Sequence, residues 1–284
     1  MNILLLGKTG LLGSEFMEIL VTKSRENIGI NLLAPDRANL DVLDFEQADI
    51  ILRDNHIDLI INCTAYTNVD QAEESREECH ALNVEAVENL LRYEIPLIHF
   101  STDYIFDAQK DEEIPENFPR NPLNYYGQTK LEAEKLLETF ADKWWNIRTT
   151  WLFGKGGDSF ISKILEKSRC APQGGGENKE LEIVSDEIGR PTSAKDLAEF
   201  VFKEFIEKQK PTGHYHIQNT GEPVSWANFA EFFLRDNGIK TKIKEISAKS
   251  LNRPAKRPIN SILKNTKLKN ELRDWQDSVR DFLS

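Results

Sequence analysis

An alternation of short apolar runs and amphipathic stretches over residues 1–150 most strongly limits how this chain can fold. The run from Ile3 to Leu6 ends at a glycine, and Leu11 to Thr22 then carries apolar residues at helical spacing. Further strands are predicted over 30–34, 59–63, 97–101 and 146–150, and helices over 45–55, 79–93 and 131–140. Repeated units of this kind favour an α/β fold, a Rossmann-type doubly wound parallel sheet with right-handed crossovers.

The pattern changes after residue 150. Ser193 with Asp196 predicts the start of one helix, and Ser225 predicts another that ends at Gly238. A last helix is expected over 275–283, and the three glycines at 174–176 are expected to form a mobile loop. We therefore expect a dinucleotide-binding domain over 1–150, with 187–215 packing back onto it, and a smaller α+β substrate-binding domain over 151–186 and 216–284. The cleft between the two is the expected ligand site.

The charge balance argues against a polyanionic partner. Lys and Arg number 36 against 47 Asp and Glu, which gives a net charge of −11, the wrong sign for non-specific nucleic-acid or anionic-membrane binding. The 3 cysteines show no metal-ligand spacing, which is typical of a reducing compartment. Gly7 and Lys8 interrupt the first apolar run too early for a signal peptide or a membrane span. We expect a cytoplasmic monomer or homodimer.

Three glycines directly follow the first predicted strand and open the first predicted helix. Gly7, Gly10 and Gly13 would let the amides of a helix N-terminus approach a pyrophosphate, although tight helix–strand packing alone also explains them. Asp36 lies 36 − 13 = 23 residues after the last glycine, where a carboxylate accepts from an adenosine ribose hydroxyl. Arg37 beside it suits a 2′-phosphate. The sequence therefore predicts a nicotinamide dinucleotide and leaves NADH and NADPH open.

A tyrosine and a lysine four residues apart suggest acid–base chemistry. Tyr126 and Lys130 fall in a segment that is expected to become helical from Asn121 and Pro122, so their side chains would share one face. A nearby ammonium would bring the pKa of the phenol closer to neutrality, although a solvated helix face also explains the pair. Thr102 ends a predicted central strand, where a hydroxyl can donate to a substrate carbonyl.

The histidines do not indicate a metal site. His99 lies in a predicted buried strand, and His214 and His216 alternate along another strand. Core or surface roles are therefore favoured over metal ligation. The five are His56, His80, His99, His214 and His216.

Several motifs together resemble the dTDP-4-dehydrorhamnose reductase family of extended short-chain dehydrogenase/reductases. They are Gly7-Lys8-Thr9-Gly10-Leu11-Leu12-Gly13, Asn62-Cys63-Thr64-Ala65-Tyr66-Thr67-Asn68-Val69-Asp70, Ser101-Thr102-Asp103-Tyr104-Ile105-Phe106, Pro122-Leu123-Asn124-Tyr125-Tyr126-Gly127-Gln128-Thr129-Lys130, Thr150-Trp151, Gly189-Arg190-Pro191-Thr192 and Arg257-Pro258-Ile259-Asn260-Ser261. They occur in order along nearly the whole chain.

The resemblance implies reduction of the 4-keto group of dTDP-4-dehydro-L-rhamnose by NADPH or NADH, the step that completes dTDP-L-rhamnose for cell-surface polysaccharide. The implied catalytic residues are Thr102, Tyr126 and Lys130. The cofactor residues, combined with those expected above, are Gly7, Thr9, Gly10, Leu11, Leu12, Gly13, Asp36, Arg37, Asp41, Val42, Cys63, Thr64, Ala65, Thr67, Tyr126 and Lys130. The substrate residues are Val69, Thr102, Asp103, Tyr104, Tyr126, Trp151 and Arg257.

Some of these assignments have a competing interpretation. Trp151 fits core packing as well as binding, and Arg253 and Arg257 fit a solvated surface as well as a phosphate clamp. Some family members bind Mg²⁺ at a glutamate-lined dimer contact; Glu15 suits this role, but Lys195 stands where a second acidic group is expected, which makes Mg²⁺ doubtful.

Three other functions compete with this prediction. Tyr104 replaces the Glu that related 4,6-dehydratases use, which disfavours elimination. A reductase of another 4-keto nucleotide sugar stays open. So does a non-catalytic NADP-binding regulatory subunit like that of methionine adenosyltransferase.

Overall fold

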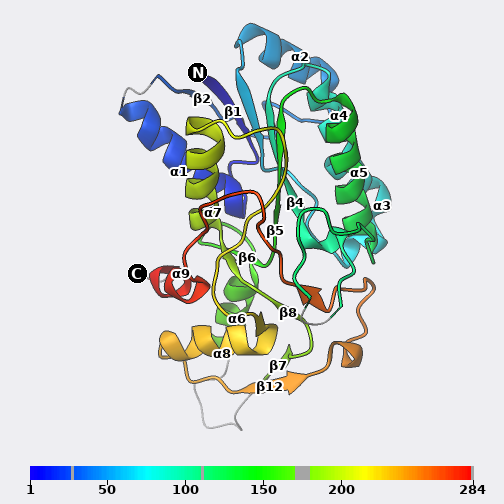
Figure 1. Ribbon diagram of the computed structural model, residues 1–284, viewed down its shortest axis with the longest axis vertical. Coiled ribbons are helices and arrows are strands. Elements are labelled where there is room, and N and C mark those ends of the chain that lie inside the picture. The colour runs from blue at the N-terminus through cyan, green and yellow to red at the C-terminus, as the bar shows by residue number, and fades with distance from the viewer. Residues whose placement is uncertain (27–28, 110–111, 170–179, 283–284) are drawn as a thin grey trace.

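The computed structural model describes residues 1–26, 29–109, 112–169 and 180–282. At its centre is a six-stranded parallel sheet in the order β10-β5-β4-β3-β1-β2 (Figure 1). Its strands are β1 (Asn2–Leu6), β2 (Asn31–Leu33), β3 (Leu59–Asn62), β4 (Leu97–Thr102), β5 (Trp144–Thr149) and β10 (Gly213–His216). This confirms the predicted Rossmann-type sheet. The strand order reverses between β1 and β3, the point at which such sheets bind ligands beyond the strands' carboxyl ends.

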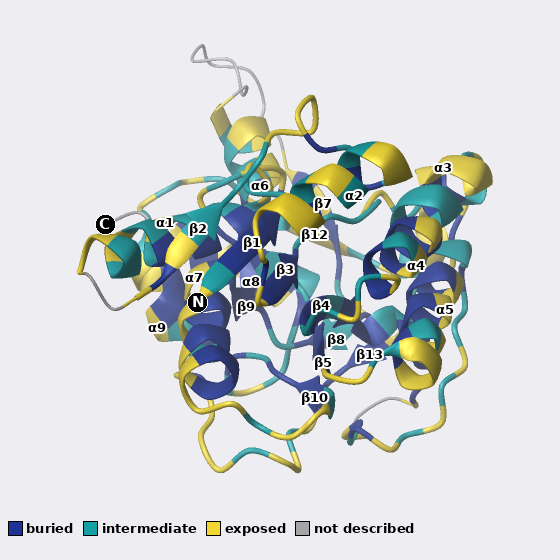
Figure 2. Cartoon of the chain, turned by 90° about the horizontal axis from the view of Figure 1, so that it is seen from above, coloured by how far each residue is buried: buried dark blue, intermediate teal, exposed yellow. Residues whose placement is uncertain are grey.

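Helices cover both faces of the sheet because successive strand residues point to opposite sides. One helical layer packs on Ile3, Leu5 and Ile98, and the other packs on Leu4 and Leu97, so the strands are buried between them (Figure 2). The first layer holds α1 (Leu11–Arg25) and α7 (Ala194–Val201), and α7 continues into the π-helical segment Phe202–Glu207. The second layer holds α2 (Phe45–Asp54), α3 (Arg76–His80), the π-helical turn Ala81–Glu85, α4 (Ala86–Leu91) and α5 (Tyr125–Phe140).

The rest of the chain forms a smaller α+β region below the carboxyl ends of the central strands (Figure 1). Its core contains Phe153, Phe229, Phe233 and Trp275. Its helices are α6 (Phe160–Arg169), α8 (Trp226–Asp236) and α9 (Trp275–Phe282), and its short strands are β6 (Leu152–Phe153), β7 (Leu181–Val184), β8 (Ile188–Gly189), β9 (Thr192–Ser193), β11 (Val224–Ser225), β12 (Ile243–Ile246) and β13 (Asn260–Ser261). The chain returns to the first domain through α7 and β10, although the exact domain boundaries stay a prediction.

Local signals in the sequence fix several helix ends, with one exception. The side chains of Ser193 and Ser225 cap α7 and α8 by accepting from backbone amides three residues later, and Gly238 adopts a positive φ just after α8, as expected. The predicted start of α5 at Asn121 and Pro122 is wrong. Asn124 is the cap, and its side chain accepts from the amide of Gly127. The glycines at 174–176 lie outside the described residues.

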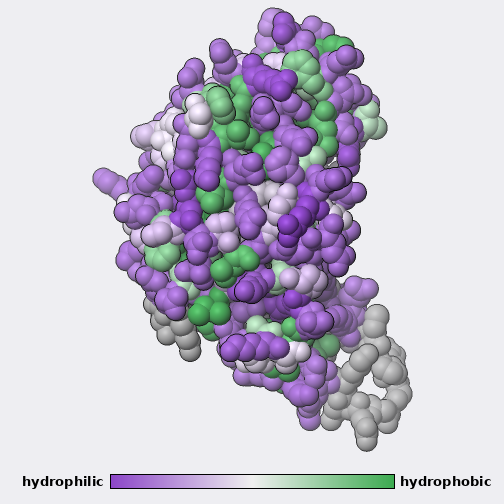
Figure 3. All heavy atoms as spheres, turned by 90° about the vertical axis from the view of Figure 1, so that its right-hand side faces the viewer, coloured by the Kyte–Doolittle hydropathy of each residue, from purple (hydrophilic) through white to green (hydrophobic). Residues whose placement is uncertain are grey.

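The described part of the chain exposes few large apolar side chains. The face in Figure 3 is mostly hydrophilic, with apolar residues scattered over it. The large hydrophobic residues that are exposed are Met1, Phe45, Ile50, Phe140, Leu251 and Ile259. Among the described helices, none has the length and the apolar character that a membrane crossing needs.

The glycine turn after β1 is packed too closely to accept side chains. Gly7 has a φ of +77°, and a Cβ there would lie 2.8 Å from the carbonyl group of Cys63. A Cβ on Gly13 would lie 2.0 Å from the carbonyl oxygen of Gly7, whereas one on Gly10 would meet only that same oxygen at 3.4 Å. The first turn of α1 therefore lies directly against the chain that leaves β1.

A buried ion pair fastens α5 to β5. Glu134 on α5 and Arg148 on β5 are both at most 1% exposed, and Arg148 donates to the two carboxylate oxygens at 2.9 and 2.7 Å. Asn146 donates to the same carboxylate at 2.8 Å. Burial raises the pKa of Glu134, but the hydrogen bonds and charge of Arg148 outweigh burial and lower that pKa to about 2.

Glu134→Gln should destabilise the fold, because it leaves the guanidinium of Arg148 buried without a counter-charge. We expect a loss of about 3–5 kcal/mol in the free energy of unfolding, measured by urea denaturation. Glu138→Gln, one turn later on α5 and partly exposed, should cost at most about 1 kcal/mol. Because the folded-state pKa of Glu134 is depressed, its contribution to the free energy of unfolding is fully present above its unfolded pKa of about 4.3. This contribution is lost as the pH falls through the folded-state pKa of about 2. Equal losses for the two variants would contradict this role.

Gly13→Ala should lower the free energy of unfolding by about 1–3 kcal/mol, because the added methyl group overlaps a backbone oxygen that cannot move independently of β1. Gly10→Ala, in the same turn, is the matched control and should stay within about 1 kcal/mol of wild type. Thermal and urea unfolding measure both. Equal stability of the two variants would show that close packing is not the reason for Gly13.

Candidate active site

The glycine turn presents free backbone donors at the switch point of the sheet. Gly10 caps α1 with no side-chain hydrogen bond, so side chains leave the first amides of this helix of 15 residues available. Together with the positive end of the helix dipole, these amides suit a pyrophosphate. Gly157 lies against the amide of Leu11, so the segment that follows β6 borders the same place. Thr9 is exposed and Leu12 is buried in the core.

The carboxylate expected at the adenosine ribose lies beside this turn and carries a salt bridge. Asp36 is exposed just beyond β2, and the Lys8 ammonium lies 3.0 Å from its Oδ1 and donates to the carbonyl of Ala34 at 2.8 Å. Arg37 pairs with Asp41 at 3.4 Å. Two cations therefore flank Asp36. Arg37 is among the cofactor residues expected from the sequence, whereas Lys8 is not. The position of Lys8 within the glycine turn is the sequence feature that could have identified it.

The loop after β3 follows the same edge of the sheet. Asn62, which ends β3, accepts from the amide and hydroxyl of Thr64 at 3.0 and 2.5 Å. Asn83 holds Tyr66 by its amide and its carbonyl, at 2.8 and 3.2 Å. The other predicted cofactor residues are Cys63 and Ala65, both half-buried, Thr67, exposed, and Val42, buried beyond β2. Asn83 holds this loop in place through Tyr66. It is not among the residues expected from the sequence, because it is 17 residues away from Tyr66.

Tyr126 and Thr102 meet where β4 ends and α5 begins. The hydroxyl of Thr102 lies close enough to the phenol of Tyr126 to lower the pKa of that phenol. This approach needs Gly127, because a Cβ there would lie 2.3 Å from the carbonyl oxygen of Tyr104. The rings of Tyr104 and Tyr126 meet edge to face at 5.8 Å. A phenol and a hydroxyl are thus brought together from residues that are 24 positions apart in the sequence (126 − 102 = 24).

The electrostatics of Tyr126 differ from the expectation. Burial, followed by the negative charge of Asp103, raises the pKa of Tyr126, and the nearby hydroxyl of Thr102 lowers it only in part. Lys130 does not bring this pKa toward neutrality, because its ammonium contacts another group. Its Nζ lies 3.1 Å from Nε2 of His99 inside the protein. Burial lowers the pKa of Lys130 to about 8, against the charge of Glu134, which raises it.

Asp103 is a buried carboxylate behind the two tyrosines. It accepts from the hydroxyl of Thr102 at 3.1 Å and from Ser261 on β13. Burial raises the pKa of Asp103 to about 6, although the hydrogen bonds from Ser261 and Thr102 oppose this. The Asn260-Ser261 motif, quoted above without a role, is thus the contact between the two parts of the chain at this site.

Two predicted substrate residues have protein partners. The Arg257 guanidinium binds the carboxylate of Asp70 through two hydrogen bonds, of 2.5 and 2.6 Å, and the Lys256 carbonyl accepts from Asn124. Trp151 stacks on Trp226 with ring centroids 3.6 Å apart, so it packs in the smaller region. Arg253 binds Glu187 at 2.7 Å, and Val69 is half-buried in the loop that ends at Asp70. Arg257 thus joins the C-terminal segment to the loop after β3.

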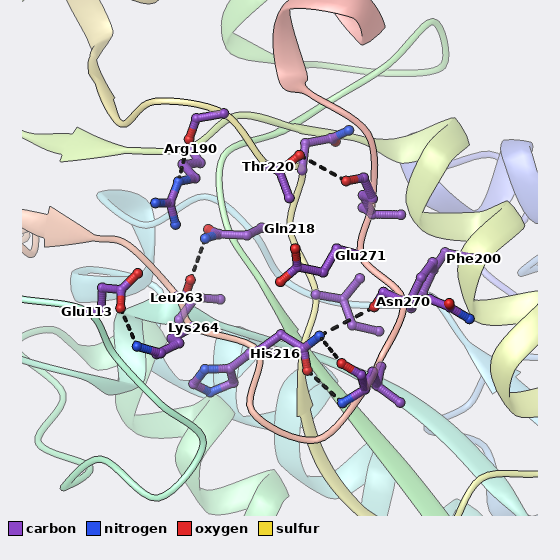
Figure 4. Close-up of a pocket in the computed structure, with 16 residues that line it drawn as sticks. Glu113, Arg190, Phe200, His216, Gln218, Thr220, Leu263, Lys264, Asn270 and Glu271 are labelled. Carbon is purple, nitrogen blue, oxygen red and sulfur yellow. Dashed lines mark hydrogen bonds and ion pairs between the residues drawn. The ribbon is translucent and has the colours of Figure 1, made fainter.

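A separate cavity of about 220 Å³ lies under the C-terminal segment (Figure 4). Arg190, Gln218 and Glu271 point toward its interior, and none of the predicted site residues lines it. No cluster of metal-ligating side chains occurs within the described residues. The charged neighbours of Glu15 are two carboxylates, Glu18 and Glu199, and two ammonium groups, Lys195 and Lys155.

Curated relatives share nearly the whole length of the chain. It is 32% identical over 302 residues to dTDP-4-dehydrorhamnose reductase of Aggregatibacter actinomycetemcomitans, over 99% of this chain and 98% of that protein. It is 29% identical to spore coat polysaccharide biosynthesis protein SpsK of Bacillus subtilis, over 99% and 96%.

Solved structures agree with this relationship. A dTDP-4-dehydrorhamnose reductase from Bacillus anthracis, in complex with NADP, superimposes with a TM-score of 0.90 at 27% identity, over 99% of this chain and 98% of that one. An ortholog from Clostridium acetobutylicum gives 0.89 at 30% identity, over 100% and 98%. The model of the RmlD substrate binding domain family matches residues 1–284. The chain therefore belongs to the RmlD substrate binding domain family.

Proposed function

We propose that the protein reduces the 4-keto group of dTDP-4-dehydro-L-rhamnose with NADPH or NADH and releases dTDP-L-rhamnose, for use in cell-surface polysaccharide. The observation that carries this proposal is the closeness of the Tyr126 phenol to Thr102 and to the ring of Tyr104 at the carboxyl end of β4. There a phenol proton and a second hydroxyl converge beside a glycine turn that suits a dinucleotide. The names of the relatives supply the substrate class.

The described residues fit a nicotinamide dinucleotide. The uncapped amides of α1 suit its pyrophosphate, and the absence of Cβ atoms at Gly7 and Gly13 gives the turn its close packing. Asp36 suits the adenosine ribose, and Lys130 suits the nicotinamide ribose as a donor. When bound, the reduced cofactor supplies a hydride to C4 of the sugar. Every other step falls to side chains of this chain.

Tyr126 acts as the general acid. As C4 gains the hydride, its oxygen becomes an alkoxide, which takes the proton from Oη of Tyr126 and becomes the product hydroxyl. The hydroxyl proton of Thr102, which is donated to Asp103 in the structure, turns to the same oxygen and stabilises its developing charge. Tyr104, Val69 and Trp151 border the sugar side, and Arg257 is available for the nucleotide phosphates once it leaves Asp70. The phenolate of Tyr126 then regains a proton from solvent.

Two further inferences concern the setting of the reaction. Cys63 and Cys79 are free thiols, which supports a cytoplasmic location. The net charge of −11 disfavours a nucleic-acid partner. We propose a monomer or homodimer, in which Lys195 beside Glu15 makes Mg²⁺ doubtful.

The decisive experiment mixes the purified protein with dTDP-4-dehydro-L-rhamnose and either NADPH or NADH, and follows the near-ultraviolet absorbance of the reduced nicotinamide. We expect oxidation of the cofactor and formation of dTDP-L-rhamnose. A C4 epimer would identify a reductase with the opposite facial selectivity. Cofactor binding without oxidation would point to another keto sugar or to a regulatory subunit, and would overturn the proposal.

Tyr126→Phe should lower kcat by about 10²–10⁴-fold, because it removes the proton donor. The Kd for NADPH should stay within about twofold, since the ring itself is retained. Tyr125→Phe is the matched control: its ring packs under Arg76, away from Thr102, and this variant should keep wild-type turnover. Stopped-flow oxidation of NADPH and fluorescence titration give the two quantities. Wild-type turnover of Tyr126→Phe would remove the phenol from the mechanism.

Lys8 and Asp36 should set the preference between the two cofactors in opposite directions. Asp36→Ala should weaken NADH more than NADPH, because a ribose hydroxyl loses its acceptor. Lys8→Ala should weaken NADPH more than NADH, because Asp36 then repels a 2′-phosphate without a neutralising charge. We expect changes of about 5–30-fold in the ratio of the two Kd values, which is about 1–2 kcal/mol. Lys23→Ala, in the last turn of α1 and away from the glycine turn, is the control. Parallel losses for both cofactors would contradict the assignment.

A further inference from the structure

A row of polar side chains crosses the sheet directly beneath α5. Asn62 on β3, His99 on β4 and Asn146 on β5 occupy the same register, so they lie side by side on one face of the sheet. They are 1%, 0% and 0% exposed. Two residues earlier on β4, the same face carries Leu97, which packs against α4 and α5 as part of an apolar core. Polar residues therefore replace apolar ones only toward the carboxyl ends of the strands.

Lys130 reaches into this row from α5. It is 2% exposed, and its Nζ lies 3.1 Å from Nε2 of His99. No other hydrogen bond of this Nζ is formed with the described residues. The same turn of α5 carries Tyr126 four residues earlier, so any movement of the lysine side chain also changes its place relative to the phenol. The contact with His99 is therefore what fixes the ammonium at this end of α5.

The chemistry of the contact assigns the proton positions. An ammonium only donates hydrogen bonds, so Nε2 of His99 is the acceptor and its ring proton is on Nδ1. Burial, together with the charge of Lys130, holds the pKa of His99 well below its usual range, so the ring stays neutral. The charged or titratable groups that act on the pKa of Lys130 are Glu134 on α5 and Cys79 on α3. Glu134 is itself paired with Arg148 on β5, and Tyr126 lies one turn before Lys130 on α5. Of these, Glu134 and Cys79 favour the charged form of Lys130.

We propose that His99 is a positioning residue for the reduction: its neutral ring accepts from Lys130 and holds the ammonium in place with its other N–H groups free for the nicotinamide ribose. This inference rests on the proposed function for its catalytic meaning, but the contact itself belongs to the chain alone. His99, which the sequence places in a buried strand, therefore has a role in addition to core packing. The ring acts through Lys130 and touches neither substrate nor cofactor.

Two substitutions separate an acceptor role from a packing role. His99→Leu keeps an apolar side chain in the row but removes the acceptor, so the charged form of Lys130 loses a partner and its pKa falls. The alkaline limb of the kcat profile should move to lower pH by roughly one unit, with KM for the sugar changed less than about threefold. His99→Gln supplies an amide oxygen at a similar reach and should restore the limb. His80→Gln, a partly exposed histidine on α3, is the control and should leave the profile unchanged.

A second measurement needs neither substrate nor cofactor. Nitrogen-15 NMR of the histidine rings should show His99 as the Nδ1–H tautomer, and the Nε2 resonance should shift when Lys130→Met removes the donor.

A third measurement uses the cofactor without the substrate. NADPH titrations of His99→Leu should show an affinity for NADPH that falls at lower pH than in wild type. If wild type does not reduce the keto sugar, the proposed function fails, and the NMR and titration results still decide the role of His99.

Three outcomes would overturn the proposal. The first is a protonated Nε2 on His99 in the wild-type protein, which the NMR spectrum reports even if a variant fails to fold. The second is an alkaline limb and an NADPH affinity in folded His99→Leu that match wild type. The third is a defect in His99→Gln as large as that in His99→Leu, because that result indicates packing of the ring.

Discussion

The buried ion pair between Glu134 and Arg148 is the constraint on which the rest of the site depends. It joins α5 to β5 where neither charge reaches solvent, so a sliding or rotating helix would leave two unpaired charges in the interior. Because α5 carries Tyr126, Lys130 and Glu134 at intervals of four residues, fixing the third fixes the other two. The place of the phenol beside Thr102 thus follows from charges two turns away. Gly127 completes the arrangement, since only a residue without Cβ lets α5 begin so close to Tyr104.

The sequence predicts the parts of this molecule that depend on local chemistry. Apolar residues locate the five strands of residues 1–150, because a strand that is covered on both faces is apolar along much of its length. The caps at Ser193 and Ser225 are read correctly, because a hydroxyl bonds an amide three residues away. The start of α5 is misread, because two Asn residues three apart are both suitable caps, and only tertiary contacts, such as that of Asn124 with Lys256, favour the second.

The partners of the site residues could not be predicted in the same way, because they come from distant parts of the chain. The spacing of Tyr126 and Lys130 shows that they share a face of a helix. It does not show that the ring of His99, 31 residues from Lys130, accepts a hydrogen bond from the ammonium. Likewise Asp70 and Arg257 are 187 residues apart and meet only because the smaller region folds back over the sheet. Desolvation is equally invisible in a sequence. It is the largest cause of the raised pKa of Tyr126, and Lys130 is not among the groups that lower that pKa.

The raised pKa of Tyr126 also bears on the form in which the site meets its substrate. At neutral pH a phenol with a raised pKa is protonated, so the phenolate that oxidation of the sugar would need as its base is scarce. Reduction needs the protonated form: a raised pKa makes the phenol a weaker acid, but the alkoxide formed at C4 is a far stronger base than a phenolate and takes the proton. The negative charge of Asp103 also favours the protonated phenol. Lys130, charged below its pKa of about 8, then stabilises the phenolate left after transfer, provided that its ammonium stays within reach. Placing the lysine therefore matters more to this chemistry than shifting the resting pKa of the tyrosine.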